Sequence, residues 1–160
     1  METLRKMAAY CSVAERCTQD VRKKIGQTGL PTESSDHIIK RLQEEKFIDE
    51  SRYAHFFTND KIRFNKWGRL KIAYELQKKG IPSSIQEEAL STINEEEYRL
   101  ILLDLLNSKR QTIKEKKKRD RFNKLLRFAT SRGFETHLAI ACLQTLGEYE
   151  KGETDANDLG

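Results

Sequence analysis

The sequence has few residues that interrupt regular structure or cross-link a small fold. Two prolines and eight glycines in 160 residues favour long helical segments. The cysteines, Cys11, Cys17 and Cys142, are odd in number, which argues against a disulfide framework. A chain of this length can bury a modest core, so it needs neither disulfides nor a metal ion to fold.

Long apolar runs are also missing. Glu2, Arg5 and Lys6 interrupt the first ten residues, so no signal-peptide core is present there. The longest apolar stretch, residues 100–106, is broken by Asp104 and is too short to span a bilayer. We therefore expect a cytoplasmic protein.

The residue patterns that carry catalysis are absent as well. His37, His55 and His137 are scattered without metal-ligand spacing, and there is no Gly-x-x-x-x-Gly-Lys loop or Gly-x-Ser-x-Gly turn. The glutamates at 95–97 favour a helix start more than an acid cluster. We expect no enzyme, no catalytic residue, no cofactor and no metal site.

Positive charge, by contrast, is concentrated in two blocks. Residues 61–80 hold seven basic groups and one acidic group, and residues 107–132 hold eleven and two. Such blocks can neutralise phosphates and gain free energy from counterion release. The alternative is a solvated helix face without a partner. Because the two blocks occupy similar places in a repeat, we favour a binding surface.

The repeat is marked by three glycines at nearly regular intervals. Gly29, Gly80 and Gly133 lie 51 and 53 residues apart, each with apolar residues eight and four places earlier and one place later. A spacing of four puts residues on one helix face, and a left-handed glycine then ends the helix. A period of this size predicts tandem helical units. The apolar positions are Val21, Ile25, Leu30, Ile72, Leu76, Ile81, Leu125, Ala129 and Phe134.

A further helix has room to precede each glycine-marked pair, near residues 4–10, 49–64 and 95–109. The fold class is therefore all-α, with three tandem three-helix repeats that bury their apolar stripes against one another. Ser83 with Gln86, Ser84 with Glu87, and Asn94 with Glu97 are candidate capping boxes. The expected units are residues 1–46, 47–93 and 94–146, followed by an acidic flexible tail at 147–160.

Within the first basic block, Trp67 could stack on a base or anchor a partner, or it could fill a gap between helices. Arg69 and Lys71 follow Gly68 near a helix start, where cations oppose the helix dipole, and this suggests a use beyond stability.

In the second block, the run 114–121 is too charged to be a buried helix, so we expect a phosphate-facing helix start. A mobile basic linker is the alternative. Neither block offers side chains suited to reading base edges, which predicts weak sequence preference. The predicted binding residues are Arg63, Lys66, Trp67, Arg69, Lys71, Lys78, Lys79, Lys116, Lys117, Arg121, Arg127 and Arg132.

Three stretches resemble the RecX family. Residues 47–54 resemble the family segment that has an aromatic residue, Ile, Asp-Glu, Arg, a second aromatic residue and Ala in this order. Residues 67–81 resemble its aromatic-Gly pair followed by Lys-Gly-Ile. Residues 127–134 resemble its Arg-Phe pair followed by Arg-Gly-Phe near the end of the family pattern. Two positions depart from the family pattern. Lys66 stands where many relatives have glycine, and Cys17 stands where the family often has a serine that caps a helix.

The resemblance implies an elongated, curved array of three helical repeats that lodges in the groove of the RecA–DNA filament. It implies a protein that mainly inhibits RecA recombinase and ATPase activity and that has no such activity of its own. We also expect a monomer. Direct contact with single- or double-stranded DNA is compatible with this role. An independent helical DNA-binding regulator and a helical protein-interaction scaffold are the alternatives.

Overall fold

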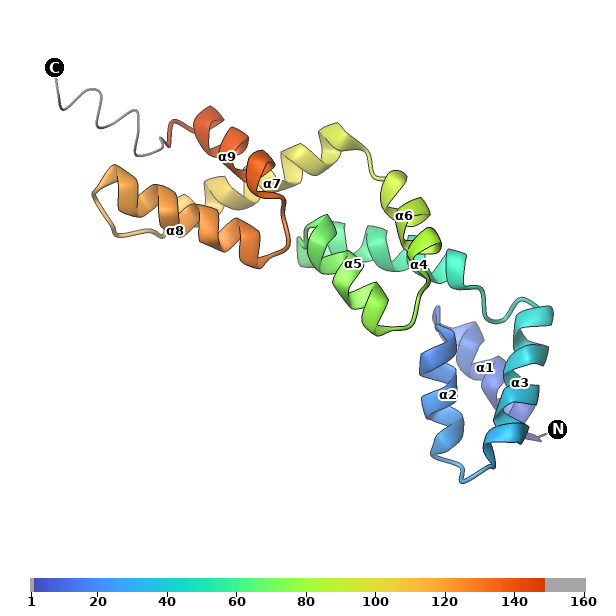
Figure 1. Cartoon of the computed structure of the whole chain (residues 1–160). Coiled ribbons are helices and arrows are strands. Elements are labelled where there is room, and N and C mark those ends of the chain that lie inside the picture. The colour runs from blue at the N-terminus through green and yellow to red at the C-terminus, as the bar shows by residue number, and fades with distance from the viewer. Residues whose placement is uncertain (1, 149–160) are drawn as a thin grey trace, which may run out of the picture. The chain divides into compact units, whose positions relative to one another are not determined.

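The computed structural model describes residues 2–148, and they form α-helices joined by short loops, with no strand among them (Figure 1). This confirms the all-α class. No helix in this described range is both long and apolar enough to cross a membrane. The helices are α1 (Glu2–Val13), α2 (Thr18–Gly26), α3 (Thr32–Glu44), α4 (Glu50–Asp60), the π-helical η1 (Lys61–Asn65), α5 (Arg69–Lys78), α6 (Ser83–Ser91), α7 (Glu95–Arg110), α8 (Lys118–Ser131) and α9 (Thr136–Thr145).

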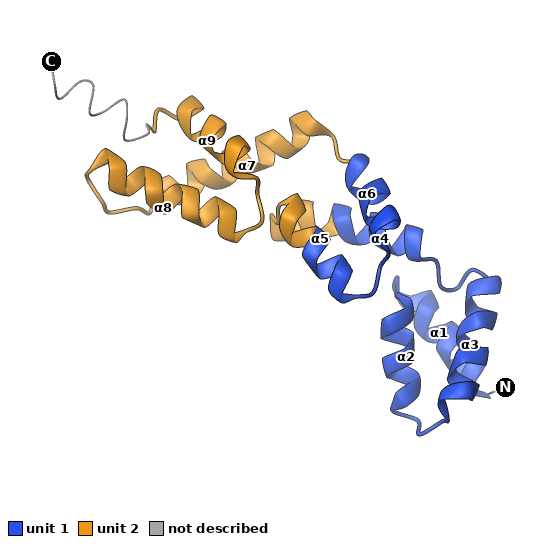
Figure 2. Ribbon diagram, in the orientation of Figure 1, with its two compact units in different colours: residues 1–59, 73–92 blue, residues 60–72, 93–160 orange. Residues whose placement is uncertain are grey.

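The chain forms two compact units, which Figure 2 colours separately. Unit 1 consists of residues 1–59 and 73–92, and unit 2 consists of residues 60–72 and 93–160. The predicted repeat boundaries at 46/47 and 93/94 stay predictions, and so does the elongated, curved shape of the whole chain.

Unit 1 has a core contributed by α1, α2, α3 and the turn after α3. Its buried members are Met7, Cys11, Val21, Ile25, Ile39, Leu42 and Ile48. Polar contacts at the start of α2 join it to later helices. The Glu50 carboxylate accepts hydrogen bonds from the Thr18 amide and hydroxyl, both at 2.8 Å. Lys79 is ion-paired with Asp20 at 2.8 Å.

Unit 2 contains α7, α8 and α9 together with η1 and the first turn of α5. Its large side chains are almost completely shielded from water, which gives this part of the chain a core of its own. The buried apolar and aromatic residues are Ile62, Ile72, Tyr98, Leu102, Leu106, Ile113, Phe122, Leu125, Ala129, Phe134, Ala139, Cys142 and Leu143.

The three repeat glycines have the conformation that the sequence predicts. Gly29 and Gly80 have φ of +78° and Gly133 has φ of +94°. The apolar residues eight and four places before each glycine are fully buried. After α5 and α8, the residue following the glycine donates its N–H to the carbonyl five places earlier, at 3.1 and 3.2 Å, which is the Schellman arrangement.

Two further helices end in the same way. Lys46 has φ of +62° after α3, and the Phe47 N–H donates to the Leu42 carbonyl at 2.8 Å. Gly147 has φ of +80° after α9, and the Glu148 N–H donates to the Leu143 carbonyl at 2.9 Å. Gly147 and the buried Glu148 thus complete α9 and are not the start of the predicted tail. The remainder of that tail, 149–160, lies outside the described residues.

One predicted helix cap is present and two are not. The Asn94 side chain accepts the Glu97 N–H at 2.8 Å, as predicted. The boxes at Ser83 and Ser84 are wrong, because Pro82 is the N-cap residue and Ser83 is already helical. Cys17 opens α2 in place of a serine, and the Asp20 carboxylate accepts its N–H at 3.3 Å, which offsets part of the weaker cap.

Candidate nucleic-acid interface

The aromatic-glycine segment begins where η1 ends. Lys66 has φ of +55°, which closes the π-helical turn, and the Trp67 N–H donates to the Lys61 carbonyl at 3.1 Å. The Lys61 and Lys71 ammonium groups lie 5.1 and 4.5 Å from the centre of the Trp67 ring. Both distances allow cation–π attraction, so the partly buried indole is associated with two lysines of its own block.

Gly68 and Gly133 meet through main-chain atoms. The Gly68 N–H donates to the Arg132 carbonyl at 2.8 Å, and the Leu70 N–H donates to the Gly133 carbonyl at 3.0 Å. A Cβ at Gly68 would lie 2.3 Å from the Gly133 carbonyl group, and a Cβ at Gly133 would lie 2.4 Å from the Cβ of Lys71. Only glycine therefore permits this approach, and we call it the glycine junction.

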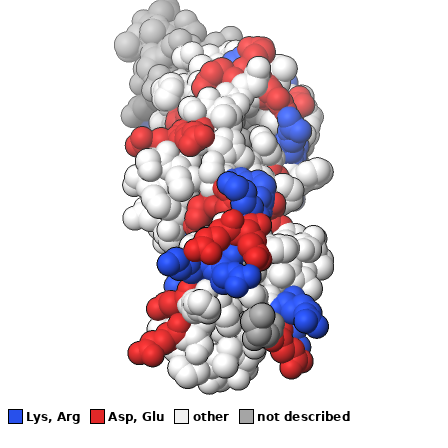
Figure 3. Space-filling model, turned by 90° about the vertical axis from the view of Figure 1, so that its right-hand side faces the viewer, with Lys and Arg blue, Asp and Glu red and all other residues white. Residues whose placement is uncertain are grey.

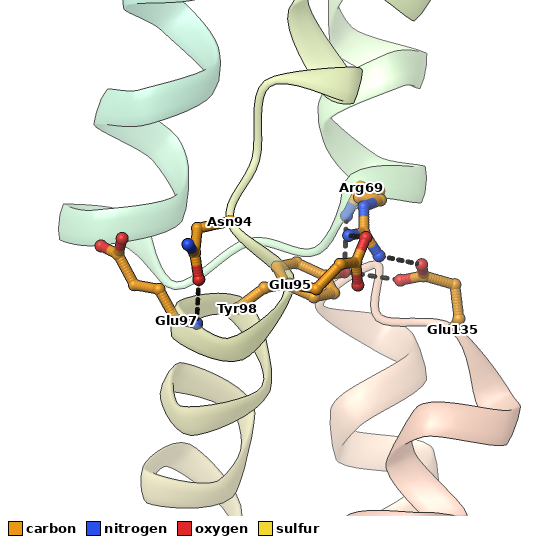
Figure 4. Close-up of polar contacts among 6 residues, drawn as sticks. All are labelled: Arg69, Asn94, Glu95, Glu97, Tyr98 and Glu135. Atoms are coloured by element: carbon orange, nitrogen blue, oxygen red, sulfur yellow. Dashed lines mark hydrogen bonds and ion pairs between the residues drawn. The ribbon is translucent and has the colours of Figure 1, made fainter.

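Arg69 lies beside this junction and points into a polar cluster (Figure 4). Its backbone N–H donates to the Tyr98 hydroxyl at 3.0 Å, and its guanidinium donates to Glu135 at 2.7 Å and also to Glu95. The Tyr98 hydroxyl donates to the other Glu135 oxygen at 2.5 Å, and the guanidinium carbon lies 4.0 Å from the Tyr98 ring centre. We call Arg69, Tyr98 and Glu135, with the more exposed Glu95, the Arg69 cluster.

Electrostatics within the cluster favour the charged forms of Glu135 and Arg69. Burial alone would raise the pKa of Glu135, but hydrogen bonds from Tyr98 and Arg69 outweigh it and lower that pKa. Burial likewise opposes the charge on Arg69, but its bonds to Glu95 and Glu135 raise its pKa. Internal carboxylates thus stabilise Arg69 at its unfavourable dipole position, and the inference that this position indicates a use beyond stability stays a prediction.

Several other predicted binding residues also have partners within the fold. Arg121 donates to Glu148 at 2.9 Å and to the carbonyls of Ile113 and Glu115 at 3.4 and 3.3 Å. The other internal contacts are Arg63 with Glu97 at 3.3 Å, Lys66 with the Arg63 carbonyl at 2.6 Å, Lys78 with Glu75 at 3.7 Å, Lys79 with Asp20 at 2.8 Å, and Arg132 with the Asn65 carbonyl at 3.3 Å.

Within the second basic block, most of the exposed cations that form no ion pair with a described residue lie at the start of α8. The exposed side chains of Lys114, Lys116, Lys117 and Arg119 form no ion pair with any described residue, and the same holds for Arg127 in the middle of α8. Lys117 is the N-cap residue in extended conformation, so this run leads directly into the helix. We call residues 114–119 the basic segment. The positive end of the helix dipole adds to its attraction for anions.

The two basic blocks do not form one continuous cluster within unit 2. Arg132, at the C-terminal end of α8, contacts Asn65, the last residue of η1, whereas the basic segment lies at the N-terminal end of α8. These ends are separated by 14 helical residues, or about 20 Å of helix. On the face that Figure 3 displays, basic and acidic side chains lie next to one another in mixed groups, and uncharged surface separates these groups. The prediction that both blocks act on one surface is untested.

A family model described as "RecX, second three-helix domain" matches residues 49–90, which contain α4, η1, α5 and all but the last residue of α6. A protein from Prosthecochloris aestuarii named "Regulatory protein RecX" is 30% identical over 89 residues. A protein of the same name from Clostridium botulinum (strain Eklund 17B) is 38% identical over 120 residues. The chain belongs to the RecX family.

The sequence matches to RecX proteins are partial in length. They cover 56% of this chain and 59% of the Prosthecochloris protein, and 72% of this chain and 55% of the Clostridium protein. The chain thus spans a little over half the length of these curated relatives.

Solved RecX structures have the same fold. The crystal structure of RecX from Lactobacillus salivarius aligns with a TM-score of 0.82 over 91% of this chain and 95% of that one, at 20% identity. A second crystal structure, of regulatory protein RecX, aligns with a TM-score of 0.79 over 86% of this chain and 68% of that one, at 25% identity.

The RecX-like segments 67–81 and 127–134 come together in the glycine junction, which the sequence motifs do not reveal by themselves. Sequence reasoning also missed Tyr98 and Glu135. A usable signal was Glu135 itself, an acidic residue directly before a helix that follows a glycine turn, where a cation on another helix could reach it. No short-range pattern connects Tyr98 to Arg69.

Proposed function

We propose that this RecX-family chain binds RecA–DNA filaments and mainly inhibits the recombinase and ATPase activities of RecA. It would thereby regulate DNA repair and recombination in the cytoplasm. The observation that carries the proposal is the basic segment at the start of α8, where the exposed side chains of Lys114, Lys116, Lys117 and Arg119 form no ion pair with any described residue. The family supports the regulatory role, because its members are named as regulatory proteins.

The basic segment suits the phosphates of a nucleoprotein filament. Each lysine or arginine that contacts a phosphate releases counterions, and affinity therefore falls as salt concentration rises. For single strands the slope of log K against log salt is about −0.7 per contact. If only the unpaired cations of the second block bind, the slope reflects about five contacts, giving roughly −3.5. Participation of the internally paired arginines would make it steeper.

A second candidate is an independent DNA-binding regulator. The basic segment favours it too, because a positively charged helix start can hold phosphate without help from a protein partner. The two candidates differ in one comparison. A filament-specific regulator binds RecA–DNA filaments more tightly than naked DNA of the same sequence, whereas an independent DNA-binding protein does not.

The test uses a triple charge reversal, Lys116→Glu, Lys117→Glu and Arg119→Glu, in the full chain. Arg69 and Arg121 are left unchanged, because their guanidinium groups hold the fold together. The matched control is Arg5→Glu, Lys23→Glu and Lys40→Glu, three exposed cations that also lack an ion pair among the described residues. Both variants change the net charge equally.

Binding to RecA–DNA filaments, naked single-stranded DNA and free RecA is measured by fluorescence anisotropy over a range of salt. RecA ATPase activity is followed in parallel. We expect the triple reversal to weaken filament binding by about tenfold or more at low salt, and the control to change it much less. Far-ultraviolet circular dichroism should be unchanged for both. A folded triple variant that binds filaments and inhibits RecA like wild type would contradict the proposal.

A further inference from the structure

The last described residues of the chain are held against the second basic block. Arg110 donates to the Leu146 carbonyl at 2.6 Å, and Arg121 donates to the Glu148 carboxylate at 2.9 Å. The Glu148 side chain is only 10% exposed, and its main chain closes the turn after α9. Two arginines therefore hold residues 146–148, the point at which the described chain ends.

This exit point lies beside the basic segment. The same Arg121 guanidinium that binds Glu148 also donates to the carbonyls of Ile113 and Glu115, within the loop that leads to α8. Lys116 is the next residue of that loop. One side chain thus connects the end of the described chain to the backbone of the segment that carries the unpaired cations.

The sequence that follows is opposite in charge to this segment. Residues 149–160 contain four carboxylates, Glu150, Glu153, Asp155 and Asp158, and one basic residue, Lys151. Glu150 comes two residues after Glu148, and twelve extended residues can reach about 40 Å. The acidic side chains are therefore within reach of every cation of the basic segment, which extends from Lys114 to Arg119.

We propose that residues 149–160 bind the basic segment of the same chain and compete there with nucleic acid. Because the acidic residues are tethered at Glu148, their effective concentration at the segment is high although each exposed ion contact is weak. The basic segment is then occupied by its own chain until a polyanion displaces it. The competition part of this inference rests on the proposed function, whereas the contact itself does not.

The contact is tested without any DNA. A nitroxide label is attached to Ala156→Cys, which leaves every carboxylate in place, and Cys11, Cys17 and Cys142 are buried and protected from labelling. We expect the label to broaden the amide resonances of residues 114–119 at low salt. The broadening should disappear when Glu150→Gln, Glu153→Gln, Asp155→Asn and Asp158→Asn are introduced together. Absence of broadening in the labelled wild-type background would overturn the proposal.

A mixed sample identifies the occupant. If spin-labelled protein broadens the amides of a separate, isotope-labelled copy, the segment is bound by a second molecule, and the intramolecular contact is rejected. The matched charge control carries Glu44→Gln, Glu87→Gln, Glu88→Gln and Asp104→Asn, four exposed carboxylates without an ion pair among the described residues. This control should retain the broadening.

Competition is tested by binding to labelled oligothymidine. The variant with the neutralised tail should bind about three- to tenfold more tightly than wild type at low salt, with a smaller gain for the charge control. In a background with Lys116→Gln, Lys117→Gln and Arg119→Gln the gain should disappear. Equal gains for tail and control variants would overturn the competition. Broadening without DNA binding by any variant would refute nucleic-acid binding by the segment, while the contact would stand.

Discussion

Replacing Glu135 with alanine tests whether the Arg69 cluster stabilises unit 2. The substitution removes the acceptor for both the Arg69 guanidinium and the Tyr98 hydroxyl. Breaking a fully buried ion pair costs roughly 3–5 kcal/mol. The Arg69 side chain is 17% exposed and that of Glu135 19%. Because Arg69 also keeps Glu95 as a partner, we expect a loss of about 2 kcal/mol in the free energy of unfolding.

The assay is urea unfolding followed by tryptophan fluorescence. Trp67 is the single tryptophan of the chain and lies in unit 2, so its emission reports on that unit. Tyr98→Phe should cost about 1 kcal/mol, since it leaves hydrogen-bonding groups at Arg69 and Glu135 without the hydroxyl. The double variant should lose less than the sum, because the two side chains share one network.

The matched control is Asp104→Ala, which removes an exposed carboxylate of α7 that has no ion pair among the described residues. It should leave the unfolding midpoint almost unchanged. A Glu135→Ala variant that loses no more stability than Asp104→Ala would refute the conclusion that internal carboxylates stabilise Arg69 at its position.

Three further outcomes follow from the geometry. Gly68→Ala should reduce the free energy of unfolding by more than about 2 kcal/mol, because the added methyl group overpacks the glycine junction. Gly26→Ala should raise the free energy of unfolding by up to about 1 kcal/mol, because Gly26 is helical and has open space around it. Thermal melts of the two variants compare these effects. The folded pKa of Glu135 is below its ordinary value of 4.5, so its stabilising contribution is present above that value and is lost as pH falls through the folded pKa. Urea titrations between neutral and acidic pH should show this loss, and Glu135→Gln should reduce it. Burial raises the pKa of the Cys17 thiol to about 11 and also raises the pKa values of the Cys11 and Cys142 thiols. A thiol reagent should therefore react with the native protein far more slowly than with the urea-unfolded chain. Equal reaction rates would contradict the buried placement of the three cysteines.

The repeat could be predicted from the sequence because its cause is local. The apolar residues four and eight places before each glycine specify the buried face of a helix, and the glycine specifies where that helix ends. The end of α3 could not be predicted in this way, because the residue that adopts the left-handed conformation there is Lys46 and not a glycine. The start of α6 was predicted near Ser83, but its N-cap residue was not, because Pro82 begins the helix without a side-chain cap.

The candidate site was less predictable, because charge along a sequence does not reveal where a side chain finds its partner. Arg69 and Glu135 are 66 residues apart, and Arg121 and Glu148 are 27 apart. Their pairing depends on tertiary packing, which residue counts within a block do not contain. Lys116 and Lys117 could be identified as exposed because several consecutive charges cannot all be buried. Their role in binding stays a prediction.

The glycine junction also affects how far related sequences can diverge. Its hydrogen bonds join main-chain atoms, so the contact depends on two residues without side chains and hardly on which side chains flank them. Substitutions at the neighbouring Leu70, which is exposed, can therefore accumulate without altering the approach of the two backbones. Such a contact is compatible with a fold that persists when sequence identity is low, as it does between this chain and the two solved RecX structures, which are 20% and 25% identical to it.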